Sequence, residues 1–394
     1  MMAELTSRER LLRALSRQET DHVPCCFMSF TALRKRVRED MFALAQAERA
    51  MGLDAMLFIP VAPRSRRPEH PDLRGLPVSF PADVRTRTWH GRADDGAATL
   101  HREIWTPAGI LTTAVRLSDD WPHGDRVPFV DDYQVPRCIK PLIAERRDLE
   151  ALRYLLAPPE EEARRRFAAE AQRAHAFVRE HQVLLAGGWG VGLDMADWLC
   201  GMEPLMVMTM ELPALVEELL EIIHRWNLRR MEVVLAAPVD LYIRRAWYEG
   251  CDFVTPRFYR QAILPRLRAE VDLAHAHGAR FGYICSSGLT PMLDLYREAG
   301  LDALIGIDPV QGTHTSLLAL KQRLGDSACL WGGVSGAVTV EQGGEDEIRE
   351  AVRQAIALLG PQGFVLSPVD NITLDLPQVW RNIDVFIDAW HRWR

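Results

Sequence analysis

The chain has 394 residues, of which 48% are hydrophobic and 26% charged, and its formal net charge is −7. This composition supports a large buried core, and the scattered basic residues argue against nucleic acid as the main partner. The sequence begins without an apolar signal core, and four glutamates interrupt the most apolar region, residues 204–223, so we expect no membrane span. Seven cysteines without Cys-x-x-Cys spacing predict reduced thiols in a cytoplasmic protein.

The first part of the chain predicts two strands separated by a helix. Thr6–Glu9 has the pattern of a capping box that begins an earlier helix. The strands are expected at Val23–Ser29 and Asp54–Ile59, with the helix over residues 40–51. Prolines then cluster between residues 61 and 140. Three segments there alternate like antiparallel strands: Val84–His90, Leu100–Trp105 and Ile110–Leu117. We therefore expect residues 61–140 to form a β-rich insertion after the second strand.

Beyond His181, short apolar runs alternate regularly with helical patterns. The expected strands are Val183–Gly187, Val239–Ile243, Phe281–Cys285, Ala303–Ile307, Ala328–Trp331 and Gly363–Leu366. The expected helices include Pro213–Leu235, Pro256–His277, Leu317–Leu324 and Glu345–Leu359. With the first two strands the count is eight, which predicts an α/β fold, a (β/α)8 TIM barrel built as a single domain by residues 1–394. An open doubly wound sheet is the alternative, but no Gly-x-Gly-x-x-Gly follows an early strand.

In such a barrel the carboxyl ends of the strands meet at one mouth and form the binding site. The substrate-binding candidates at these ends are Met28, Trp189, Arg245, Trp247, Asp308, Trp331 and Asn371, and Pro60 ends the second strand. Several of these side chains are aromatic and one is a carboxylate. A pocket lined in this way suits a small molecule that is partly apolar or cationic.

Cys285 and Asp370 also follow strands of the predicted barrel. A thiolate and a carboxylate at one mouth can share a divalent metal, for which zinc is the best match. Alternatively, Cys285 packs in the core and Asp370 caps the following loop. Glu249 follows another strand, in a loop at the mouth, where it is either a general base or a surface acid. The sequence leaves both choices open.

Several stretches, read together, resemble the uroporphyrinogen decarboxylase superfamily over nearly the whole chain. They are Glu9–Leu15 with Asp21–Pro24, Ile104–Gly109, Cys138–Lys140 with Asp148–Leu149, Trp198–Glu203, Thr255–Pro256 with Tyr259 and Pro265, and Leu324–Gly325 with Trp331–Val334. True uroporphyrinogen decarboxylases carry Arg-Gln-Ala-Gly-Arg-Tyr near the first strand, where this chain has Phe27–Arg34 without those arginines. The insertion is more similar to that of the corrinoid-dependent methyltransferase branch.

The resemblance to the methyltransferase branch implies a zinc site made by His-x-Cys on one strand and a Cys near the last. This chain has Tyr283-Ile-Cys285 at the first place and Asp370 at the second, which leaves a harder and weaker site or none. The demethylating activity of the branch then fits best. It implies a methyl group moved from a small methoxylated or methylamine-type donor to the corrinoid (cobalamin) cobalt of a partner protein. Asp370 or Glu249 is the expected acid, or else Asp370 and Cys285 hold a metal that acts as a Lewis acid. Tyr283 is expected to donate a hydrogen bond to the leaving oxygen.

Two other functions stay open. One is a cofactor-independent decarboxylase, a lyase of a small acid, with Arg244 or Arg245 holding the carboxylate and Asp370 donating the proton. The other is a non-catalytic barrel that binds a small molecule. The resemblance also implies a homodimer. The Trp-rich C-terminal helix is compatible with one, although packing within a single subunit explains that helix equally.

Overall fold

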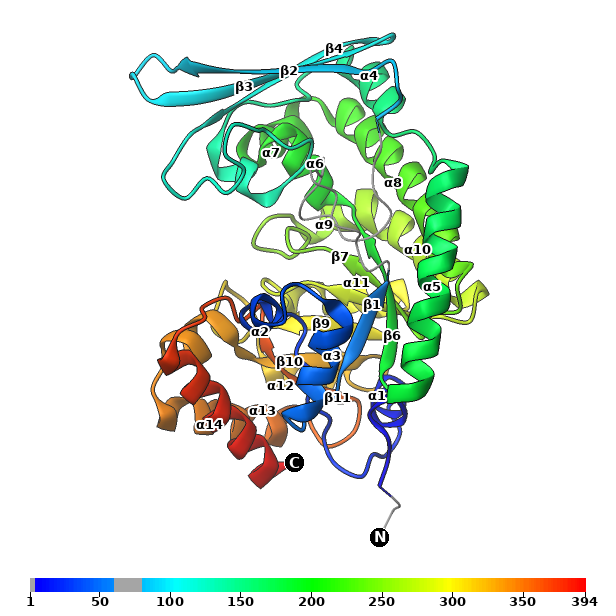
Figure 1. The fold of residues 1–394 in the computed structure, drawn as a ribbon, viewed down its shortest axis with the longest axis vertical. Helices are drawn as coiled ribbons and strands as arrows, with labels where there is room; N and C mark the ends of the chain where they lie inside the picture. The colour runs from blue at the N-terminus through cyan, green and yellow to red at the C-terminus, as the bar shows by residue number, and fades with distance from the viewer. Residues whose placement is uncertain (1–3, 60–79) are drawn as a thin grey trace. The chain divides into compact units, whose positions relative to one another are not determined.

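The computed structural model describes residues 4–59 and 80–394, which divide into two compact units. The first comprises residues 4–59, 169–188 and 235–394, and the second comprises residues 80–168 and 189–234 (Figure 1). The start of the predicted insertion and the predicted site residue Pro60 lie outside the described residues. The single-domain organisation and the insertion boundaries stay predictions. Across the described part of the chain, no helix is both long and apolar enough to pass through a bilayer.

A curled parallel sheet forms the centre of the first unit. Its strand order is β1-β6-β7-β8-β9-β10-β11, a seven-stranded sheet within the described residues. The strands are β1 (Met56–Ile59), β6 (Leu184–Gly190), β7 (Leu241–Arg245), β8 (Arg280–Ile284), β9 (Ala303–Ile307), β10 (Cys329–Ser335) and β11 (Phe364–Val369). Every residue of β6, β7, β9, β10 and β11 is buried. Strands covered on both faces need continuous apolar runs, and this explains why the sequence shows runs without alternation.

Helices follow most strands of the first unit and cover the sheet (Figure 1). They are α1 (Ser7–Leu15), α2 (Thr31–Arg36), α3 (Met41–Ala50), α5 (Glu161–His181), α9 (Pro256–Phe258), α10 (Leu264–Ala276), α11 (Leu293–Ala299), α12 (Leu317–Leu324), α13 (Glu345–Leu359) and α14 (Pro377–Trp393). The predicted bounds of α12 and α13 are confirmed, as is the Thr6 capping box before α1. The predicted helix Pro256–His277 contains a π-helical segment, Tyr259–Ile263, between α9 and α10.

The predicted first strand, Val23–Ser29, is wrong as a strand. Within the described residues it contributes only an isolated parallel bridge, Cys25 with Leu366 of β11. Pro24 has no N–H to donate, and the Cys25 and Met28 N–H groups bond to the side chains of Asp54 and Ser367. The segment still links β11 to the residues before β1 through backbone hydrogen bonds. The Cys26 N–H donates to the Leu366 carbonyl, and the Asp54 N–H donates to the Cys25 carbonyl. The α/β fold is confirmed, but a regular eight-stranded barrel is not.

The second unit contains an antiparallel sheet of strand order β2-β3-β4-β5. The strands are β2 (Arg85–Arg92), β3 (Ala98–Thr106), β4 (Gly109–Arg116) and β5 (Cys138–Lys140). They match the three segments predicted to alternate and add a short fourth strand. The helices of this unit are α4 (Asp148–Leu155), α6 (Leu193–Cys200), α7 (Met202–Glu211) and α8 (Pro213–Leu235), with a 3-10 turn at Asp132–Arg137. Leu100, Val115 and Val127 form a small core against the sheet.

Candidate functional site

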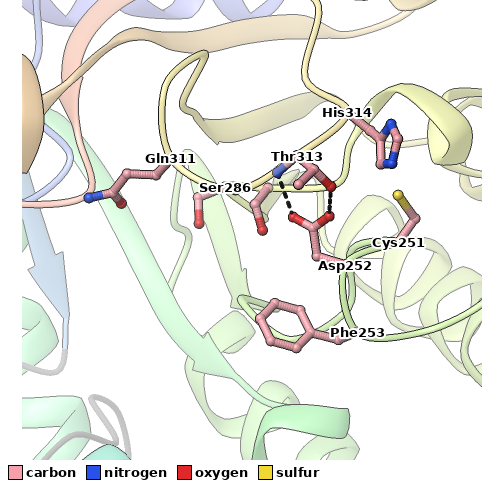
Figure 2. A pocket seen from close by; sticks show the side chains of 9 residues that line it. Cys251, Asp252, Phe253, Ser286, Gln311, Thr313 and His314 are labelled. Carbon is pink, nitrogen blue, oxygen red and sulfur yellow. Dashed lines mark hydrogen bonds between the residues drawn. The ribbon is translucent and has the colours of Figure 1, made fainter.

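A pocket of about 660 Å³ opens among the loops that follow β7, β8 and β9 in the first unit. Its lining residues are Cys251, Asp252, Phe253, Ser286, Ser287, Gln311, Gly312, Thr313 and His314. Figure 2 shows the Asp252 carboxylate directed at Thr313, with Phe253 on one side and Cys251 and His314 on the other. Parallel α/β sheets place ligands at the carboxyl ends of their strands. This pocket has that position and is our candidate site.

Backbone hydrogen bonds join the three loops into one wall. Cys251 N–H donates to the Gly288 carbonyl at 3.1 Å, and Gly288 N–H donates to the Thr313 carbonyl at 3.0 Å. Gly288 is the crossing point, with a φ of +64°. A Cβ atom at Gly288 would lie 2.6 Å from the backbone nitrogens of Cys251 and Asp252, closer than real contacts allow. Only glycine fits here, because the backbone is left-handed and the next loop touches it.

Asp252 supplies a negative charge to the pocket. The Thr313 N–H donates to its Oδ2 at 3.0 Å, and the Thr313 hydroxyl donates to its Oδ1. Partial burial raises the pKa of Asp252, but the hydrogen bonds from Thr313, together with the Ser287 hydroxyl and nearby His314, outweigh it and leave the pKa below its usual value. A carboxylate has about four acceptor positions, so this one can still bind a ligand.

The other groups of the pocket are an aromatic ring, a thiol and an imidazole. The Phe253 ring packs edge-on against Tyr248, with 5.3 Å between centroids. Partial burial, and then the charge of Asp252, raises the pKa of the Cys251 thiol. Cys251 is therefore a thiol at neutral pH and a poor nucleophile. His314 is exposed at the pocket and can donate or accept a proton.

Next to the pocket in sequence lies a buried network of charged and phenolic groups. Glu249 and Tyr283, both predicted catalytic residues, are fully buried and bonded to each other, with the Tyr283 hydroxyl 2.5 Å from Glu249 Oε2. Arg244 Nη2 lies 2.5 Å from Glu249 Oε1, and its Nη1 lies 3.1 Å from Glu270 of α10. The Tyr259 hydroxyl donates to that of Tyr283 at 3.1 Å. The network thus faces the covering helices, and its members do not line the pocket described above.

This network bears on the predicted carboxylate clamp. Arg244 is 2% exposed and bonded to two glutamates, so it offers no free face to a substrate carboxylate. Arg245, the other proposed clamp, is buried with its guanidinium 4.0 Å from the Trp247 ring centroid. Both arginines therefore have structural partners within the first unit.

The predicted metal pair, Cys285 and Asp370, does not fit a zinc site. Cys285 is fully buried, and its sulfur lies 3.5 Å from the Tyr296 hydroxyl, which donates to it. The Tyr283 hydroxyl is engaged by Glu249. Over residues 4–59 and 80–394, no three His, Cys, Asp or Glu side chains gather in a way that could hold a metal ion. A protein zinc site normally needs at least three such ligands. Asp370 follows β11 and is half-buried.

Three predicted substrate-binding residues take part in hydrogen bonds with or within the N-terminal segment. The Trp331 indole N–H donates to the Cys26 carbonyl at 2.9 Å, and the side chain is fully buried. The Asn371 amide exchanges two hydrogen bonds with Thr31, at 3.0 Å and 2.9 Å. The Met28 backbone N–H bonds to Ser367. These contacts stabilise the fold, and none of the three side chains lines the described pocket.

Asp308 holds the start of the loop that contributes Gln311 to the pocket. It follows β9, is fully buried, and accepts the N–H groups of Val310 and Gln311 at 2.8 Å and 3.0 Å, which fixes the start of the loop. Burial raises the pKa of Asp308 above its usual value, although those N–H groups lower it. Trp189 lies near the end of β6, at the residue where the second unit begins, and Arg230 donates to its carbonyl.

Sequence reasoning identified the strand ends but missed the residues that line the pocket. These lie two to eight residues beyond the ends of β7, β8 and β9. The signal was present in two polar, glycine-containing runs. Ser286–Gly288 directly follows a predicted strand, and Gln311–His314 comes shortly after the next predicted strand. Such runs mark loops, and loops at the carboxyl ends of parallel strands carry function.

Comparison with known proteins gives a family and a fold. A methyltransferase from Methanosarcina mazei has 19% sequence identity and a TM-score of 0.60, with 99% of each chain covered. A B12-independent methionine synthase from Shewanella sp. W3-18-1 has 10% identity and a TM-score of 0.47, covering 94% of this chain and 97% of the other. A search of curated proteins finds no match. The sequence model for uroporphyrinogen decarboxylase (URO-D) matches residues 121–393, more than half of the sequence. The chain therefore belongs to the URO-D family.

Proposed function

We propose that this protein is a methyltransferase that takes a methyl group from a small methoxylated or methylamine-type donor. The donor binds in the pocket beyond β7, β8 and β9. The acceptor is the cobalt of a corrinoid (cobalamin) held by a separate partner protein that docks over the pocket. Family membership and the fold likeness to the Methanosarcina methyltransferase support methyl transfer as the reaction class.

The observation that carries this proposal is the pairing of an ionised carboxylate with an aromatic ring in one open pocket. Hydrogen bonds keep Asp252 charged, and Phe253 lies beside it. A carboxylate and a π-face together bind a methylammonium group, through charge attraction and cation–π contact. A methoxylated ring can stack on Phe253 and donate its hydroxyl groups to the Ser and Thr oxygens of the lining.

In the reaction, the bond between the methyl carbon and the donor oxygen or nitrogen breaks, and its electron pair stays on that atom. An electron pair of the acceptor forms the new bond to the methyl carbon. A methylammonium donor leaves as a neutral amine, whereas a methoxylated donor leaves as an oxyanion that needs a proton. We assign this proton to His314, the imidazole of the pocket, because Glu249 and Tyr283 are enclosed in the buried network. No step is assigned to zinc, since the ligands do not fit.

The direct test mixes purified protein with cob(I)alamin and one donor at a time, either tetramethylammonium or a methoxylated phenol, and follows the visible spectrum of the cobalamin. We expect methyl transfer with at least one donor. Asp252→Asn should raise the KM for tetramethylammonium about 10- to 100-fold, the value of a hydrogen bond or contact to a charged group. His314→Gln should lower kcat for the methoxylated donor about 10²- to 10⁴-fold.

The control is Cys138→Ser, because the Cys138 thiol belongs to the second unit and does not line the pocket. Its rates should equal those of the wild type. The lyase alternative is tested in parallel by CO₂ release from small carboxylic acids. No spectral change with either donor, together with CO₂ release, would replace the methyltransferase proposal by a decarboxylase. Donor binding without turnover in both assays would indicate a binding protein.

A further inference from the structure

The loop between β7 and α9 connects the buried network with the pocket. Its residue Glu249 belongs to the network, and two positions later Cys251 begins the pocket lining. We propose that Glu249 is a positioning residue that, through Gly250, fixes the pocket wall formed by residues 251–253. This assignment concerns the shape of the pocket and does not rest on methyl transfer.

Both carboxylate oxygens of Glu249 are engaged by rigid partners. Oε1 accepts from Arg244, which lies on β7, and Oε2 accepts from Tyr283, which lies on β8. Both contacts measure 2.5 Å, and all three side chains are at most 2% exposed. Hydrogen bonds to a charged group in a buried setting are stronger than neutral ones. Glu249 is thus held at two points on adjacent strands.

The partners of Glu249 are themselves anchored to the covering helices. Arg244 also bonds to Glu270 on α10, and Tyr283 accepts from Tyr259 in the π-helical segment. Burial raises the pKa of Tyr259 and of Tyr283 well above the usual value, so both phenols keep the protons that these bonds need. Two strands and two helical segments therefore determine where Glu249 lies.

Gly250 couples the position of Glu249 to the pocket wall, because its backbone is packed closely against the loop that follows β8. A Cβ atom there would lie 2.0 Å from the Ser287 carbonyl oxygen and 3.4 Å from the Cys285 sulfur. Directly after it, Cys251 N–H bonds to Gly288, and the Phe253 N–H closes a turn on the Gly250 carbonyl at 3.1 Å. A shift of Glu249 would therefore displace residues 251–253 against the loop that follows β8.

The test uses Cys251 as a local reporter of the wall. Wild type, Tyr283→Phe and Tyr259→Phe are labelled with iodoacetamide at pH 8, and mass spectrometry gives the labelling rate of Cys251 and, as an internal reference, of Cys138. Both thiols are partly exposed. Tyr283→Phe removes a hydrogen bond to Glu249, so we expect Cys251 labelling to accelerate about tenfold or more while Cys138 is unchanged. Tyr259→Phe leaves both bonds of Glu249 in place and should accelerate Cys251 labelling much less.

Three results would overturn the proposal. They are an unchanged Cys251 rate in Tyr283→Phe, an equal acceleration of Cys251 and Cys138, and equal effects of the two phenylalanine variants. If circular dichroism shows that Tyr283→Phe does not fold, Glu249→Gln takes its place. The glutamine keeps the size of the side chain but weakens the contact with Arg244, so Cys251 should again label faster than in the wild type, and an unchanged rate would overturn the proposal. Loss of methyl transfer alone would have no bearing on these rates.

Discussion

Replacing Arg244 by methionine tests the energetics of the buried network most directly. The guanidinium is 2% exposed and is bonded to Glu249 at 2.5 Å and to Glu270 at 3.1 Å, both of which are also buried. Removing one member of a buried ion pair costs about 3–5 kcal/mol because the partner charge is left uncompensated. Two carboxylates lose their cation here, so we expect Arg244→Met to lower the free energy of unfolding by about 4–5 kcal/mol.

Urea denaturation followed by circular dichroism at pH 7 measures this loss. Arg349→Met is the matched control, because Arg349 pairs with Glu345 on the exposed face of α13 and its removal should change the free energy of unfolding far less. Adding Glu249→Gln and Glu270→Gln to Arg244→Met removes the uncompensated charges and should restore part of the stability. A loss below about 1 kcal/mol for Arg244→Met, or no recovery in the triple variant, would refute the reasoning.

Three further predictions follow from other sites. Burial raises the pKa of Glu48 from 4.5 to about 8. Between these two pH values, rising pH should lower the free energy of unfolding of the wild type by up to about 1.4 kcal/mol per pH unit, because only the unfolded chain releases the proton readily. Urea titrations across pH 5–8 should show that Glu48→Gln lacks this decline. Gly288→Ala should be clearly less stable in thermal unfolding than Gly278→Ala, because both glycines have positive φ but only the first would clash, with residues 251–252. Metal analysis should find equal zinc in wild type and Cys285→Ala, and stoichiometric zinc lost in the variant would contradict the ligand geometry.

Most of the parallel sheet could be predicted from the sequence because its signals are local. Each strand from β6 to β11 is a short apolar run between helical patterns, and the ends of α12 and α13 were predicted to the residue. The segment Val23–Ser29 could not be judged in this way. Its apolar run looks like a strand, but whether its N–H groups bond to a neighbouring strand or to side chains depends on residues far along the chain, Asp54 and Ser367.

The site was harder to predict, for a reason that lies in the strands themselves. A strand buried on both faces shows no alternation, so the sequence does not reveal which of its residues face the helices. Tyr283 was expected at a pocket mouth and instead contacts Tyr259 and Tyr296 in the helical layer. Tyr283 does bond to Glu249, another residue predicted to be catalytic, but the two lie in a buried network and not at the pocket. The residues that line the pocket depend on how three loops cross, which Gly288 makes possible.

The N-terminal segment has a consequence for how the molecule is made. Its contacts reach almost the full length of the chain, since Met28 bonds to a residue 339 positions away and the Trp390 indole bonds to the Val23 carbonyl across 367 positions. A polypeptide emerging from the ribosome exposes this apolar stretch long before its partners are synthesised. The first unit can therefore complete its core only near the end of translation, and until then residues 23–29 are a natural binding target for chaperones.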